Sequence, residues 1–229
     1  MIRIYLSIFL LLMSFATALS QDHQFFTGLF PEATLTKKLK NDQKIIFKIE
    51  HQNVVYNNAI EQRENLQLTH HYRTDLMSFY DVRLNPTKSI AFGAFHRIQE
   101  GANANRIIQQ FALVNRLREM KLAHRIRTDQ TFTTGESVEI RLRYRMATEI
   151  PLAGSTLDPG EHYLVLSNEP ILSLQEGEFE IENRLVFSLG KLLTSSQKLE
   201  WSIDYRTDKF IQEGFRTRLW AKIGYFYSF

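Results

Sequence analysis

Hydrophobic and polar residues alternate with a period of two along most of this chain. Successive side chains of a β-strand point to opposite faces, so this pattern predicts strands with one apolar and one polar face. In the clearest case, Val138–Ile150, one face carries aliphatic and aromatic side chains and the other carries mostly charges. Eleven segments follow this pattern: Phe25–Leu39, Lys44–Val55, a segment ending at Leu84, Ile90–Ile98, Arg106–Arg116, Lys121–Phe132, Val138–Ile150, His162–Leu174, Glu178–Leu192, a segment through Leu199–Arg206, and Phe215–Phe229.

The length of these segments and the last of them indicate a membrane barrel. Strands of about 10 residues or more exceed the usual strand of a soluble protein and match a tilted strand that crosses a bilayer. Phe215–Phe229 ends on an aromatic residue, as does the closing strand of an outer-membrane barrel. We therefore predict an all-β, up-and-down antiparallel transmembrane β-barrel. A secreted soluble β-sandwich or lipocalin-like barrel, with its apolar faces inward, is the alternative.

The N-terminus predicts export. Arg3 is followed by a short apolar run and then by Ala18-Leu19-Ser20, a small-x-small cleavage site. This order of features is typical of a secretory signal peptide, and the run is too short for a spanning helix. We expect residues 1–20 to be the signal peptide and residues 21–229 to form one barrel domain. The expected location is the bacterial outer membrane.

The pattern does not fix the number of strands. Bacterial barrels normally contain an even number of strands, whereas the pattern shows eleven. If the C-terminus is periplasmic, the turns near Asn41, Pro86, Leu117, Pro151–Gly160 and Thr194 share its side. The first strand would then run downward from outside, which a periplasmic N-terminus forbids. We expect ten to twelve strands and prefer twelve, with Asp22–Phe30 as a short additional strand.

Composition excludes several classes of function. The net charge of +3 is too small to indicate a nucleic-acid partner. The chain contains no cysteine, no glycine-rich phosphate loop and no histidine spacing that suits a metal, so we expect no cofactor. Outer-membrane lipid and the barrel-assembly machinery, which would engage the C-terminal strand, are the expected partners.

The polar faces carry many charges, which we expect to point into the lumen. Burying an arginine in hydrocarbon costs about 2–4 kcal/mol near the bilayer midplane, so Ile140, Leu142 and Tyr144 should face lipid. Cross-strand neighbours lie about 5 Å apart, so arginines and carboxylates can pair and fill the lumen. An anion-attracting constriction is the alternative. The candidate lumen-lining residues are Arg125, Arg127, Asp129, Glu139, Arg141, Arg143, Arg145, Glu182, Arg184, Asp204, Arg206 and Arg218.

Catalytic residues are not evident. His70, His71, Asp75 and Ser78 lie close in sequence, and a barrel lipase would require a Ser–His pair with a polar orienting residue. The two histidines, however, point to opposite faces of a strand, and no motif marks a nucleophile. We therefore expect structural or interfacial histidines and no enzymatic activity.

Short motifs along the chain resemble an uncharacterised family of outer-membrane β-barrels from Bacteroidetes-type bacteria, known only as a domain of unknown function. The motifs are Leu35-Thr36-Lys37-Lys38-Leu39, His124–Asp129, Arg141–Arg145, Leu166-Ser167-Asn168-Glu169, Glu182-Asn183-Arg184-Leu185 and the aromatic C-terminus. The resemblance implies a barrel in the outer membrane and carries no activity. Three functions stay open: a narrow pore for anionic or polar solutes, a structural or surface-interaction barrel with a plugged lumen, and an outer-membrane lipid hydrolase. We expect a non-enzymatic barrel.

Overall fold

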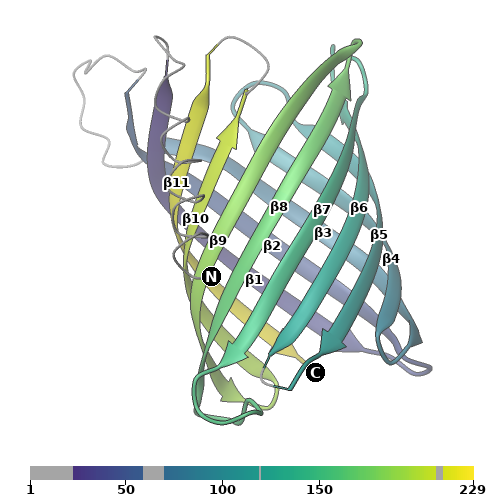
Figure 1. The fold of residues 1–229 in the computed structure, drawn as a ribbon. Coiled ribbons are helices and arrows are strands. Elements are labelled where there is room, and N and C mark those ends of the chain that lie inside the picture. The colour runs from purple at the N-terminus through teal and green to yellow at the C-terminus, as the bar shows by residue number, and fades with distance from the viewer. Residues whose placement is uncertain (1–22, 59–69, 119, 210–213) are drawn as a thin grey trace, which may run out of the picture.

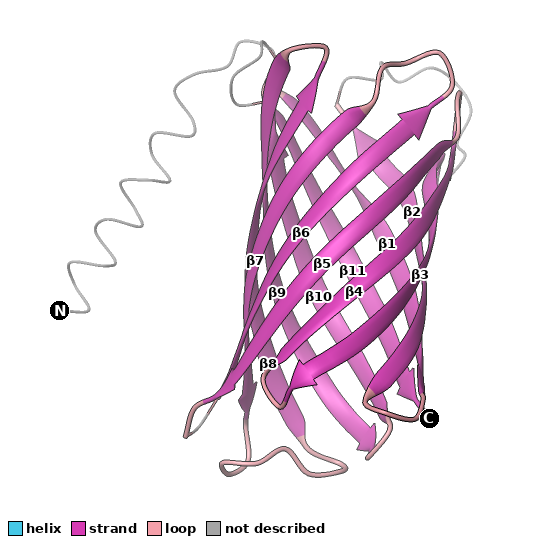
Figure 2. Cartoon of the chain, turned by 90° about the vertical axis from the view of Figure 1, so that its right-hand side faces the viewer, coloured by secondary structure: helices cyan, strands magenta, loops and turns pink. Residues whose placement is uncertain are grey.

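The chain forms a closed barrel of eleven strands in the residues that the structure describes (Figures 1 and 2). The structure is a computed structural model that describes residues 23–58, 70–118, 120–209 and 214–229; the expected signal peptide lies outside these ranges. The strands are β1 (Gln24–Lys38), β2 (Gln43–Asn57), β3 (His70–Asn85), β4 (Lys88–Gln99), β5 (Ala104–Arg116), β6 (Lys121–Thr133), β7 (Glu139–Pro151), β8 (His162–Gln175), β9 (Glu178–Thr194), β10 (Gln197–Asp208) and β11 (Arg216–Ser228).

The barrel closes through a parallel pair, which corrects two of our predictions. Consecutive strands pair antiparallel, but β1 and β11 run in the same direction, in register from Gln24 opposite Arg216 to Thr36 opposite Ser228. The all-β barrel is confirmed and eleven lies within the expected range. The preference for twelve strands was wrong, as was antiparallel pairing throughout. In an up-and-down barrel with an odd number of strands, the first and last strands necessarily point the same way.

The two ends of the barrel differ in their connections. The turns after β1, β3, β5, β7 and β9 lie at one end together with the C-terminus, whereas β1 and β11 both begin at the opposite end (Figure 2). We call these the turn end and the loop end. At the turn end, Asn41 and Asp42 adopt positive φ values of 59° and 58°, a conformation that asparagine and aspartate tolerate better than most residues.

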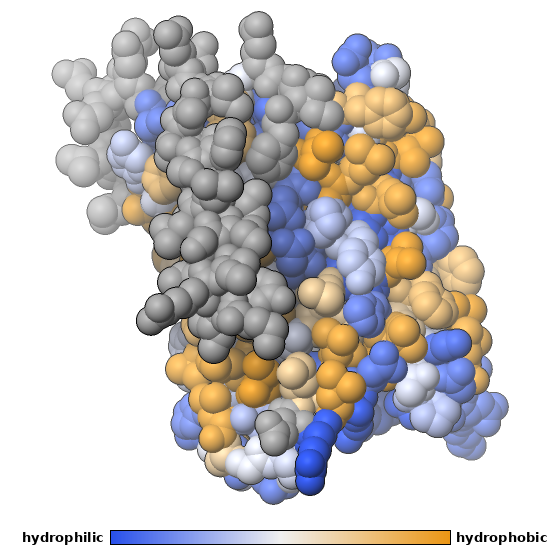
Figure 3. Space-filling view, in the orientation of Figure 1, coloured by the Kyte–Doolittle hydropathy of each residue, from blue (hydrophilic) through white to orange (hydrophobic). Residues whose placement is uncertain are grey.

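The outer wall of the barrel is rich in exposed apolar side chains (Figure 3). On β7, Ile140 and Leu142 are 51% and 50% exposed, whereas their neighbours Arg141 and Arg143 are only 6% and 8% exposed. The alternation along the sequence therefore separates an apolar outside from a charged inside. No helix in the described ranges is long and apolar enough to cross a membrane.

Some polar side chains also face outward, and they bond to one another. Gln109 on β5 and Gln130 on β6 exchange amide hydrogen bonds of 3.1 and 3.2 Å, and the Thr128 hydroxyl donates to Gln109 at 2.6 Å. These residues lie on the same outer face as the exposed side chains of Ile107 and Ile126. Mutual pairing satisfies the hydrogen-bonding groups of these three side chains on the outer face.

Two apolar clusters occupy part of the interior. One contains Phe26, Phe30, Val54 and Trp220, which lie on β1, β2 and β11 at the parallel seam. The other contains Phe79, Phe95 and Ile108 on β3, β4 and β5. Both clusters lie among the first five strands and β11, and charged side chains from all parts of the wall line the rest of the interior.

Candidate functional site: the charged interior

The centre of the barrel encloses a cavity of about 320 Å³ whose lining is dominated by charge. Basic side chains outnumber acidic ones by twelve to seven along this lining. They are Lys48, Arg73, Arg97, Arg106, Lys121, Arg125, Arg127, Arg143, Arg145, Arg184, Arg206 and Lys222 against Glu32, Glu50, Asp75, Glu149, Glu169, Glu200 and Asp204. The interior therefore carries an excess of positive charge, although the whole chain is nearly neutral.

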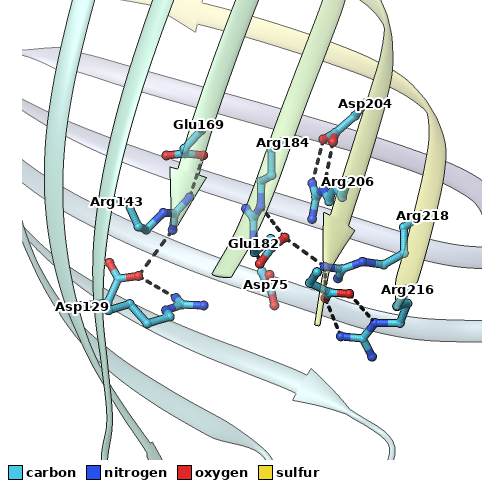
Figure 4. Close-up of polar contacts among 12 residues, drawn as sticks. Asp75, Asp129, Arg143, Glu169, Glu182, Arg184, Asp204, Arg206, Arg216 and Arg218 are labelled. Atoms are coloured by element: carbon cyan, nitrogen blue, oxygen red, sulfur yellow. Dashed lines mark hydrogen bonds and ion pairs between the residues drawn. The ribbon is translucent and has the colours of Figure 1, made fainter. Parts of the chain in front are cut away.

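One ion-pair network joins β6, β7 and β8 (Figure 4). The fully buried Asp129 accepts a hydrogen bond of 2.6 Å from Arg141 and a longer one of 3.4 Å from Arg143. Glu169 accepts from Arg143 at 3.0 Å and from Arg125 at 2.7 Å. Arg143 thus bridges two carboxylates that come from strands on either side of it.

A second network lies on β9, β10 and β11 (Figure 4). Glu182 binds Arg184 through two hydrogen bonds of 2.7 and 3.1 Å, and it also accepts from Arg218 at 3.0 Å. Arg218 continues to Asp208 at 2.6 Å, and Asp208 holds Arg216 through two further bonds of 2.9 and 2.6 Å. Arginine–carboxylate pairs with two parallel bonds are the geometrically most specific kind, so this network fixes the orientation of Arg184 and Arg216.

A third set of ion pairs lies on the opposite wall, on β1 to β4 and β11. Glu32 on β1 lies 2.7 Å from the Lys48 ammonium and 2.8 Å from that of Lys222, so it joins β2 to β11 across the seam. On β3, Asp75 accepts two bonds from Arg97 of β4, at 2.7 and 2.8 Å. The parallel seam therefore has an internal ion pair in addition to its backbone bonds.

Three arginines of the cavity lining have no carboxylate within 4 Å among the described residues: Arg106, Arg127 and Arg145. Arg127 donates to the amide oxygen of Gln110 at 2.7 Å, and its guanidinium lies 5.0 Å from the centre of the Phe79 ring. The Arg106 guanidinium lies 4.4 Å from the centre of the Phe95 ring, and its Nε has no hydrogen-bond partner within the described ranges. These three arginines thus contribute to the excess positive charge of the cavity lining.

The structure places the residues singled out from sequence in these networks. Nine of them form short ion pairs: Arg125, Asp129, Arg141, Arg143, Glu182, Arg184, Asp204, Arg206 and Arg218. Arg206 binds its own strand neighbour Asp204 at 2.8 and 2.7 Å, and Glu139 lies 3.8 Å from Arg141. Arg127 and Arg145 face the cavity without an ion pair to any acidic residue that the structure describes.

Sequence reasoning missed several of the partners. Glu169 and Asp208 were absent from the candidate residues, yet each binds two arginines. Glu169 stands directly before Pro170, and Asp208 stands at the end of its strand, where the alternating pattern is weakest. Arg106 and Glu32 were missed too, because each is isolated among uncharged residues of its segment. Their positions in the period-two pattern are the signal that would have identified them.

A second, wider cavity of about 970 Å³ lies at the turn end. Its lining comes from the connections after β1, β3 and β5 and includes Lys38, Asp42, Asp81 and Arg83. Lys121 belongs to the lining of both cavities. The central cavity is therefore adjacent to a broad polar opening at one rim.

The structure separates the residues considered for lipid hydrolysis. Asp75 points into the barrel and binds Arg97, whereas Ser78 lies on the opposite face of β3. His71 and His51 stack at 5.2 Å and share the Thr74 hydroxyl, at 3.0 and 2.8 Å. No hydrogen bond links Ser78 to a histidine in the described part of the chain. Within those same ranges, no group of three or more histidine, aspartate or glutamate residues suits a metal ion.

Comparison with known proteins identifies one family. A family model described as "Protein of unknown function (DUF2490)" matches residues 27–225, which cover nearly the whole barrel. No curated protein and no solved structure matches the chain. The match agrees with the resemblance noted from sequence, while the expected origin in Bacteroidetes-type bacteria stays a prediction.

Proposed function

Because the chain belongs to the DUF2490 family, whose description assigns no activity, we propose its function from the barrel itself. It is an outer-membrane protein without enzymatic activity that admits small anions into a narrow, arginine-rich lumen. The excess of basic over acidic side chains along the central cavity carries this proposal.

The membrane setting is supported by the outer surface and by the N-terminus. Long strands that alternate between exposed apolar and inward charged residues match the wall of an outer-membrane barrel. The proposed signal peptide, residues 1–20, would direct the chain across the inner membrane. Outer-membrane lipid would cover the apolar wall, and the assembly machinery would engage the C-terminal strand β11.

Anion entry is supported by electrostatics. Walls of low dielectric constant focus the field of charges that line a narrow passage, and arginine or lysine rings select anions. In this barrel most carboxylates of the cavity lining are already held by arginines or lysines, whereas Arg106, Arg127 and Arg145 face the cavity without an ion-pair partner among the described residues. A small anion would therefore be attracted and a cation repelled.

Planar-bilayer recording tests the pore. The purified mature barrel should conduct, and its reversal potential in a KCl gradient should show a preference for chloride. Arg145→Glu should weaken or reverse that preference, since Arg145 faces the cavity and has no ion-pair partner in the described ranges. Arg143→Glu is less informative, because Arg143 holds Asp129 and Glu169 in place. Arg118→Glu is the matched control and should change selectivity little, because Arg118 is exposed in the turn after β5 and lines neither cavity.

A closed structural barrel is the second candidate, and the interior clusters favour it. Phe26, Phe30 and Trp220 fill the interior beside the seam, and Phe79 with Phe95 fills it beside β4. Ion pairs cross much of the remaining space. If the barrel inserts but no conductance appears at any voltage, the structural function replaces the pore. Release of fatty acid from lipid by the purified barrel would contradict both candidates.

A further inference from the structure

Four arginines form a compact block on the inner face of β6 and β7. Arg125 lies directly opposite Arg145, and Arg127 lies directly opposite Arg143. Like charges placed opposite each other on one face destabilise a sheet. The four arginines therefore repel one another and destabilise the barrel unless negatively charged groups offset the repulsion.

Carboxylates offset only half of the block. Glu169 binds Arg125 and Arg143, and Asp129 binds Arg143. Arg127 is 8% exposed, and its side chain makes one hydrogen bond among the described residues, to the neutral amide of Gln110; its Nε has no partner there. A buried charge without an opposite charge is among the most costly features of a protein interior.

A further unpaired arginine borders the same cavity. Arg106 is 7% exposed and lies against Phe95, in the apolar cluster that also contains Phe79, the ring contacted by Arg127. Arg106, Arg127 and Arg145 all line the central cavity of about 320 Å³. Two guanidinium groups that are nine-tenths buried, those of Arg106 and Arg127, thus border the cavity without a carboxylate partner among the described residues.

We propose that this part of the cavity is a binding site for a small solute that carries a phosphate or sulfate group. Arg127 and Arg145 bind the oxyanion, and Arg106 contributes positive charge from the side of Phe95. The inference rests on the proposed entry of anions and names the class of anion. The cavity volume lies at the lower end of the range for small-molecule sites.

The chemistry of the block favours a tetrahedral oxyanion over a carboxylate. A phosphate or sulfate offers three or more acceptor oxygens and can bond to guanidinium groups from more than one strand at once. A carboxylate has only two acceptor oxygens. Glu169 shows this limit, because Arg125 and Arg143 already occupy both of its oxygens. Every cation of the block is arginine rather than lysine, and the planar guanidinium matches phosphate by two parallel bonds.

Calorimetric titration of the mature barrel in detergent, at constant ionic strength, tests this site with pyrophosphate, sulfate and acetate as probes. Pyrophosphate and sulfate should bind, and acetate should not. Arg127→Gln, which keeps a polar side chain beside Gln110, should weaken pyrophosphate binding about tenfold or more. Arg83→Gln, an exposed rim arginine paired with Asp42, is the matched control and should bind as the wild type does.

Thermal unfolding of the same samples controls for folding. Both Arg127→Gln and Arg145→Gln should unfold at or above the wild-type temperature without ligand, because each relieves repulsion within the block. Pyrophosphate should raise the unfolding temperature of the wild type and should raise that of the variants less. If Arg127→Gln does not fold, Arg145→Gln provides the same comparison.

Three results would overturn the site: equal binding of all three probes, absence of binding, or full binding by both variants. Binding in detergent does not require an open passage. Binding without conductance would therefore support this site and contradict the proposed pore, whereas conductance without binding would contradict the site and leave the pore standing.

Discussion

Tyr163 and Gly190 face each other across β8 and β9, and the tyrosine ring fills the space that a side chain at position 190 would need. A Cβ atom at Gly190 would collide with three ring carbons of Tyr163. Tyr163 is fully buried and its hydroxyl donates to Glu200 on β10 at 2.8 Å. Because Gly190 has no side chain, the Tyr163 ring can lie over it on the inner wall and bond to Glu200 of β10.

Gly190→Ala should destabilise the barrel by about 1–3 kcal/mol, because the added methyl forces the Tyr163 ring to move. Urea unfolding in detergent, followed by the heat-modifiable band on gels, measures the loss. The same substitution in a Tyr163→Ala background should cost much less. An equal loss in both backgrounds would show that the ring is not what excludes a side chain.

The two tryptophans should report the membrane setting. Trp201 lies on the outer face of β10 and is 46% exposed, whereas Trp220 is fully buried beside Phe26 and Phe30. Brominated lipids should quench the fluorescence of the wild-type barrel through Trp201. Trp201→Phe should remove most of this quenching and Trp220→Phe should retain it. Quenching that survives in Trp201→Phe would contradict a lipid-facing outer wall.

Asp129→Asn should lower the free energy of unfolding by roughly 3 kcal/mol, since removing one partner of a buried ion pair leaves the other charge uncompensated. Asp129 is fully buried and bonds to Arg141 and Arg143. Denaturant titration measures the change. Asp42→Asn is the control: its side chain is 69% exposed and pairs with Arg83 at 3.4 Å, so about 0.5 kcal/mol or less is expected. Similar losses in the two variants would argue against a structural network around Asp129.

The parallel seam can be tested by cross-linking, because the chain contains no cysteine of its own. Leu35 on β1 is the direct neighbour of Tyr227 on β11. Adjacent strands lie about 4.8 Å apart, within the Cα range of a disulfide. Leu35→Cys combined with Tyr227→Cys should therefore form a disulfide on mild oxidation.

Leu35→Cys with Ile223→Cys is the matched control. Ile223 pairs with Pro31, four residues along the strand from Leu35, or about 13 Å at the usual rise per residue. No disulfide should form in this pair. Cross-linking of the control but not of the first pair would exclude the parallel register, and failure of both would indicate another strand between β1 and β11.

The alternation of the sequence determined which side of each strand a residue occupies. It assigned Arg141 and Arg143 to one face and Leu142 to the other, and the structure buries the first two and exposes the third. It also located the turns, such as the one after Asn85, where Asn85 Oδ1 accepts from the backbone of Thr87 and Lys88. These features depend on neighbours in the chain, so a period of two and local turn chemistry suffice to predict them.

Only the tertiary structure decided how the barrel closes and which charges meet. The parallel contact of β1 with β11 joins residues about 190 positions apart, such as Phe26 and Arg218, and no local pattern specifies it. The pairing of Arg125 with Glu169 likewise skips β7, because the side chains cross the interior instead of following one strand pair. Such contacts depend on the number of strands, their tilt and the register between them. These are properties of the closed sheet as a whole, so residue spacing alone does not determine them.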